Sequence, residues 1–69
     1  MLSKYDIFCK VVEHGGFTRA ANAIQYSQSA VSQTVKNLEQ ELGLILLTRG
    51  KDGIHLTPDG AAIFPYIQA

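Results

Sequence analysis

The stretch Phe17–Leu42, FTRAANAIQYSQSAVSQTVKNLEQEL, carries the pattern that decides the fold. It predicts a short helix, a tight break at Gln25-Tyr26, and a longer helix that starts after Ser27, a residue type that caps helices. Gly43 ends the longer helix, since glycine readily adopts the left-handed conformation that closes one. Two helices joined by so short a break are typical of a helix-turn-helix. The longer helix has an apolar seam at helical spacing, formed by Val31, Val35, Leu38 and Leu42.

The opposite side of the longer helix is polar in a way that suits DNA readout. It offers hydroxyls, amides and one cation, whereas an ordinary surface helix favours Glu and Lys. Glutamine can bond an adenine edge in two places, serine can bond bases or phosphates, and the N–H groups at a helix start can hold a phosphate. A merely solvated helix face is the alternative interpretation. The candidate DNA contacts here are Ser27, Gln28, Ser29, Ser32, Gln33 and Lys36, with Asn37 beside them.

A first helix is expected before this pair. Ser3 followed by Asp6 is a capping-box pattern, and Gly15-Gly16 stops the helix. Thr18 is then predicted to cap the short second helix, a position from which its hydroxyl can also touch a phosphate. Arg19 is a candidate phosphate contact. The first helix is expected to bury Ile7, Phe8, Val11 and Val12, with Ala20, Ala21 and Ile24 buried by the second.

The pattern changes to a hairpin after Gly43. Residues 44–47 are aliphatic, 49–53 are turn-forming, and 54–56 alternate, which together predict a small β-hairpin. Thr57-Pro58 then starts another helix, with threonine as cap and proline in the first position. The expected fold is mainly α with a small β-hairpin. This is a winged helix-turn-helix with a three-helix core, a wing and the start of a linker helix. Residues 1–57 would form the winged domain and 58–69 the beginning of a linker or dimerisation helix.

Charge gives a mixed signal. Six basic and six acidic residues leave the chain neutral, whereas DNA-binding domains are usually basic. Arg49 and Lys51 on the predicted wing are nevertheless candidate phosphate contacts. Arg49 has an alternative role, pairing with Glu39 or Glu41 to brace the wing, and each cation could simply aid solubility.

Several other classes are disfavoured by the sequence. No Ser-His-Asp, Cys-His or paired-carboxylate arrangement stands out, and 69 residues leave little room for a substrate pocket, so we expect no enzyme and no cofactor. His14 and His55 have no partner at metal-ligand spacing. Cys9 is expected to be a small core hydrophobe. The opening residues lack a secretory signal and no apolar run approaches the ~18 residues of a membrane span, so we expect a cytoplasmic protein.

Many positions agree, in order, with one family pattern: Phe8, Val12, Phe17-Thr18-x-Ala20-Ala21, Ser27-Gln28-Ser29-Ala30-Val31-Ser32, Leu38-Glu39, Leu42-Gly43, Leu46-Leu47-x-Arg49 and Leu56-Thr57-Pro58-x-Gly60. In these positions the chain resembles the N-terminal domain of LysR-type transcriptional regulators, from about Leu2 to Phe64. Two residues depart from the family pattern: Gln33 stands where arginine is frequent, and Leu47, within its motif, stands where phenylalanine is frequent.

The resemblance implies a bacterial activator or repressor in which a long linker helix and a ligand-sensing domain follow this domain. Such regulators bind interrupted palindromes as dimers or tetramers, paired through the linker helix. Because the sensing domain and most of the linker helix are missing, we expect the chain to be a fragment. The residues matching Gln28, Ser29, Ser32 and Gln33 would face the major groove, and the hairpin at 49–53 would touch backbone or minor groove.

We therefore predict sequence-specific binding of double-stranded operator or promoter DNA, without membrane association. The recognition helix would be residues 28–42, in the major groove, and the wing residues 49–55. The full-length parent would form a homodimer or higher oligomer through its linker helix. The alternative is a winged helix that binds another protein, which the neutral charge and the apolar end residues Tyr66 and Ile67 would suit.

Overall fold

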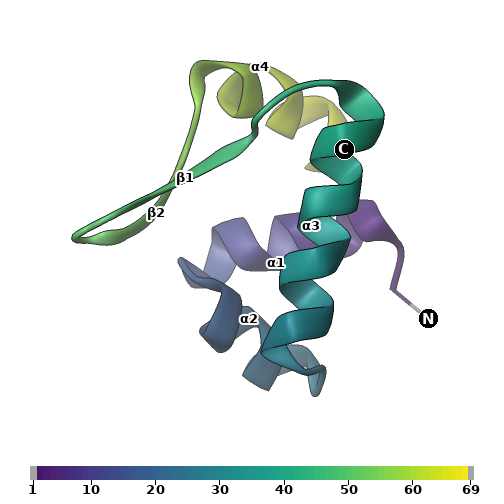
Figure 1. Ribbon diagram of the computed structural model, residues 1–69, viewed down its shortest axis with the longest axis vertical. Helices are drawn as coiled ribbons and strands as arrows, with labels where there is room; N and C mark the ends of the chain where they lie inside the picture. The colour runs from purple at the N-terminus through teal and green to yellow at the C-terminus, as the bar shows by residue number, and fades with distance from the viewer. Residues whose placement is uncertain (1, 69) are drawn as a thin grey trace.

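Four helices and one antiparallel hairpin make up the structure, a computed structural model that describes residues 2–68 (Figure 1). This order confirms the predicted winged helix-turn-helix. Residues 1 and 69, the outer ends of the two predicted units, lie outside the described residues. In chain order the elements are α1 (Lys4–His14), α2 (Phe17–Ile24), α3 (Gln28–Leu42), β1 (Leu47–Gly50), β2 (Gly53–Leu56) and α4 (Pro58–Gln68).

The starts of α1 and α3 are set by serine caps, as predicted. The Ser3 hydroxyl accepts the Asp6 N–H at 3.1 Å while the Ser3 N–H donates to the Asp6 carboxylate at 3.0 Å. These bonds from Ser3 lower the pKa of Asp6. At α3 the Ser27 hydroxyl accepts the N–H of Ala30 at 3.0 Å. Gly43 closes α3 in the left-handed conformation, at φ 69°.

The prediction that Thr18 caps α2 is wrong. Gly16 occupies the cap position and Thr18 is the second residue inside the helix. The chain enters the helix immediately after the glycine pair, and the Gly16 carbonyl already accepts the N–H of Ala20 at 3.1 Å. The far end of α2 is closed by Gln25 at φ 61°, a left-handed conformation in a residue other than glycine. This single residue produces the tight turn into α3 that the sequence predicted.

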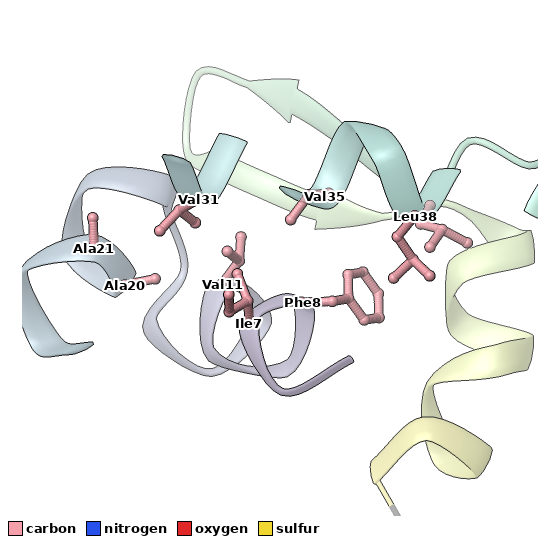
Figure 2. Packing of buried hydrophobic residues seen from close by; sticks show 9 residues of the cluster. Ile7, Phe8, Val11, Ala20, Ala21, Val31, Val35 and Leu38 are labelled. Carbon is pink, nitrogen blue, oxygen red and sulfur yellow. The ribbon is translucent and has the colours of Figure 1, made fainter. Parts of the chain in front are cut away.

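The core lies where α1, α2 and α3 meet, and Figure 2 shows side chains from all three helices pointing into one shared space. Phe8 is its largest fully buried side chain. Val12, Ile24 and Leu42, also predicted to face the core, are only half-buried. Residues from each predicted apolar stripe reach the core, which contains Ile7, Phe8, Val11, Ala20, Ala21, Val31, Val35, Leu38 and Leu46.

The start of α4 is held against residues 45–46, the segment that leads into β1. The Thr57 hydroxyl accepts the Gly60 N–H at 2.9 Å, as a cap does, and donates to the carbonyl of Ile45. The Thr57 N–H also bonds the Leu46 carbonyl at 3.0 Å. Gly60 is buried at this junction. These contacts fix where α4 leaves the domain.

Further along α4, one edge of the helix returns to the core. The ring of Phe64 packs edge-on against Phe8, with 6.1 Å between centroids. Ile67 is half-buried against the same core, whereas Tyr66 is 83% exposed. Of these two apolar end residues, only Tyr66 is therefore largely open to solvent. Pro65 lies within α4.

The hairpin projects from the helical body (Figure 1). Its register pairs Leu47 with Leu56 and Gly50 with Gly53, which leaves only Lys51 and Asp52 in the turn. The turn is shorter than the predicted 49–53, because Arg49 belongs to β1 and pairs with Ile54.

Cys9 differs from its predicted core position. It is half-buried, and burial, followed by nearby Glu13 and Asp6, raises the pKa of its thiol. In the part of the chain that the structure describes, no helix is long and apolar enough to cross a membrane.

Candidate nucleic-acid interface

The polar side of α3 is exposed, as predicted. Gln28, Ser29, Gln33 and Lys36 are exposed, and Ser32 is half-buried. This side is opposite the buried seam of α3, so fixing the seam in the core fixes the direction of these groups. The other predicted contacts are exposed as well, namely Thr18, Arg19, Ser27, Arg49 and Lys51.

Three adjoining hollows bring most of these residues together around Phe17, which lines all three. The first joins Thr18, Gln28 and Arg49. The second holds Arg49 with Ser32 and Lys36, and the third joins Thr18 with Arg19 and Lys51. The start of α2, one side of α3 and the hairpin therefore form a continuous surface. We call it the α3–wing surface: Thr18, Arg19, Gln28, Ser32, Lys36, Arg49 and Lys51.

Three predicted contacts do not line these hollows: Ser27, Ser29 and Gln33. The hydroxyl oxygen of Ser27 accepts a hydrogen bond in the helix cap. The Gln33 amide donates to the Asn37 side chain at 2.9 Å, one turn further along α3. All three remain exposed on or beside the first half of α3.

The ion pairs show how a neutral chain keeps one positive surface. Lys4 at the start of α1 pairs with Glu41, and Lys10 faces Glu13 at 3.8 Å. Within residues 2–68 no ion pair involves the other cations, which are the four on the α3–wing surface. The hollows also contain two carboxylates, those of Glu39 and Asp52, so four cations against two anions leave this surface net positive although the whole chain is neutral.

Glu39 lies in the same hollow as Lys36 and Arg49 but is engaged elsewhere. Its carboxylate accepts the backbone N–H groups of Leu46 and Leu47, at 2.7 and 3.3 Å. Glu39 thereby fixes the entry to β1. The predicted pairing of Arg49 with Glu39 or Glu41 is wrong.

Arg49 instead lies over the ring of Phe17, with 4.7 Å between its guanidinium carbon and the ring centroid. The sequence did not predict this contact, and in the structure Phe17 is half-buried. Only the hairpin register, which puts Arg49 within β1, brings the two residues together.

Metal chemistry has no visible basis in the described residues. No three His, Cys, Asp or Glu side chains among them gather closely enough to hold an ion.

Comparisons with known proteins agree on one family. Residues 2–61 match the model for bacterial regulatory helix-turn-helix proteins of the lysR family. The HTH-type transcriptional activator AaeR of Escherichia coli K12 is 49% identical over 59 residues, 86% of this chain and 19% of the relative. A transcriptional repressor of Pseudomonas aeruginosa is 48% identical over 67 residues, 97% of this chain and 21% of the relative. The chain thus spans about a fifth of these relatives, whose names as regulators agree with the prediction that it is not an enzyme.

Solved structures give the same result. A BenM DBD complex with catB site 1 DNA superposes with a TM-score of 0.88 at 37% identity, covering 94% of this chain and 70% of that one. A CbnR DBD–DNA complex gives 0.88 at 32% identity, covering 94% and 75%. With its helix order, hairpin and sequence all matching, the chain belongs to the lysR family of bacterial regulatory helix-turn-helix proteins and has the fold of their DNA-binding domain.

Proposed function

We propose that this domain binds double-stranded operator or promoter DNA sequence-specifically, with the first half of α3 in the major groove. The amides and hydroxyls of that half would meet base edges, and the wing would lie on the backbone or minor groove. In this proposal residues 1–57 are the binding unit and 58–69 begin the linker helix. The contacts we assign are Thr18, Arg19, Ser27, Gln28, Ser29, Ser32, Gln33, Lys36, Arg49 and Lys51.

The observation that carries the proposal is how the cations of residues 2–68 are distributed: the unpaired ones lie on the α3–wing surface, and the paired ones lie elsewhere. All four cations without an ion pair in residues 2–68 border one polar helix face, while both paired cations lie on α1. Fixed positive charge around groups that can read bases is what a duplex requires. Related domains solved with DNA add support, and nothing comparable favours the protein-binding alternative.

For the full-length protein we propose a cytoplasmic transcriptional regulator that acts as a dimer or higher oligomer. The relatives' names support the role as a regulator. The proposed pairing rests on α4, which would begin the linker helix. The exposed Tyr66 ring on α4 is available for pairing with another subunit.

Two variants should distinguish a residue that contacts a base from one that contacts a phosphate. Gln33→Ala should relax preference at one base position by roughly 1–3 kcal/mol, because a lost base contact affects one base pair. Lys51→Ala should weaken binding to all sequences alike, since a phosphate contact carries no sequence information. Competition binding against operator variants that differ at single positions would measure both.

The chain offers matched controls for this experiment. Gln40 is exposed two turns beyond Gln33 along α3, and Lys10 is a cation on α1. Gln40→Ala and Lys10→Ala should leave preference and affinity unchanged. Equal losses on every sequence for both Gln33→Ala and Lys51→Ala would contradict the division.

A further inference from the structure

We infer that Phe17 is a positioning residue for DNA binding: its ring holds the Arg49 guanidinium ready for a phosphate without neutralising it. The inference rests on the proposed function, because it assigns a task within the same surface. Three observations carry it. The guanidinium carbon lies 4.7 Å from the ring centroid. Phe17 lines all three hollows of the surface. The carboxylate that lines a hollow together with Arg49, that of Glu39, is bonded to backbone N–H groups.

The geometry of stacking explains why a ring suits this task better than a carboxylate. A guanidinium resting on an aromatic face uses its own face, so the N–H donors around its edge remain available. A bidentate carboxylate would occupy two of those donors and cancel the charge. The Phe17 ring therefore restrains Arg49 while leaving it a full cation whose donors are not taken by a carboxylate of the described residues.

The position of Phe17 connects the two parts of the surface. The residue opens α2, directly after the glycine pair, while Arg49 lies in β1 opposite Ile54. The contact thus joins the wing to the helix-turn-helix unit, and Arg49 lines one hollow with Gln28 and another with Lys36. Holding a long side chain in advance removes part of the entropy cost of ordering it on binding.

The test compares Phe17→Leu, which keeps an apolar side chain but removes the ring face, with Phe17→Tyr, which keeps the face. We expect Phe17→Leu to weaken affinity for any duplex about 3–10-fold, from the cost of ordering one long side chain. Phe17→Tyr should bind like the original. In an Arg49→Gln background Phe17→Leu should cause no further loss, because the group it positions is gone.

Phe64→Leu is the control for general loss of aromatic packing. Phe64 lies on α4, outside the α3–wing surface, and is half-buried against Phe8 of α1. Its replacement should lower stability, yet in the folded domain it should show no coupling to Arg49. All affinities are measured at a temperature where each variant is folded.

A spectroscopic readout tests the geometry even if Phe17→Leu fails to fold. Protons of the Arg49 side chain should be shifted upfield by the ring in the free original domain and in Phe17→Tyr. Absence of that shift, or an equal loss from Phe17→Leu with and without Arg49, would overturn the inference. If the original domain bound no duplex at all, the proposed function would fail instead, so the two failures are distinguishable.

Discussion

Gly60→Ala should lower the free energy of unfolding by about 2–4 kcal/mol, although alanine is the better helix former. A Cβ at this position would overlap the carbonyl oxygen of Leu46. It would also lie 3.0 Å from the Leu46 carbonyl carbon and 3.1 Å from Leu56 Cδ2. Backbone cannot swing aside as a flexible side chain can. The Leu46 carbonyl is held further by the N–H of Thr57. Relief therefore requires α4 to move off the entry to the hairpin.

Urea unfolding of both proteins measures this effect. Gly16→Ala is the matched control, because a Cβ there meets nothing within 4 Å and Gly16 has extended backbone at φ 177°. That change should lower the free energy of unfolding by about 1 kcal/mol or less, the cost of replacing a glycine cap with alanine, a poorer one. A Gly60→Ala protein as stable as the original would show that α4 does not pack as closely on Leu46 as the structure has it.

Raising salt from 50 to 200 mM should weaken duplex binding about 150-fold for a monomer. The figure assumes that Arg19, Lys36, Arg49 and Lys51 each neutralise one phosphate, which gives a slope of log affinity against log salt of about −3.6. A dimer on two half-sites should give about −7. Fluorescence anisotropy with a labelled duplex measures the slope at several salt concentrations.

Single variants then show how much each cation contributes to the slope of log affinity against log salt. Lys36→Gln should reduce its magnitude by about 0.9, the contribution of one released counterion. Lys10→Gln should leave the slope unchanged, since Lys10 lies on α1 beside Glu13. A dimer slope nearer −2 would mean that most of the four cations do not face DNA, whatever their place on the surface.

The fold was largely predictable because its local signals agree with one another. The serine caps, the glycine stops and the apolar seam of α3 each act within a few residues, so sequence spacing suffices to find them. The α2 start shows the limit of such reasoning. Thr18 and Gly16 rank about equally as caps by residue type, and the helix begins at the glycine pair. Residue preference therefore does not decide between the two starts.

The exposure of the candidate DNA contacts could be predicted from the sequence, but the contacts among them could not. Exposure of the α3 polar side follows from its buried seam, so Gln28 and Lys36 could be placed from sequence. The contact of Arg49 with Phe17 joins residues far apart in the chain and depends on hairpin register. Which cations are paired within the described residues and which are free also could not be predicted from the sequence, because Lys4 meets Glu41 only when α1 and α3 pack together.

The most direct test of where DNA binds is an amide NMR titration of the labelled domain with a short duplex at low salt. The account predicts shifts clustered at residues 27–36 and 49–55, with the α1 residues around Lys10 unmoved. If the signals of the first half of α3 and the hairpin stay in place while the domain is folded and the duplex intact, the α3–wing surface is not a DNA-binding surface.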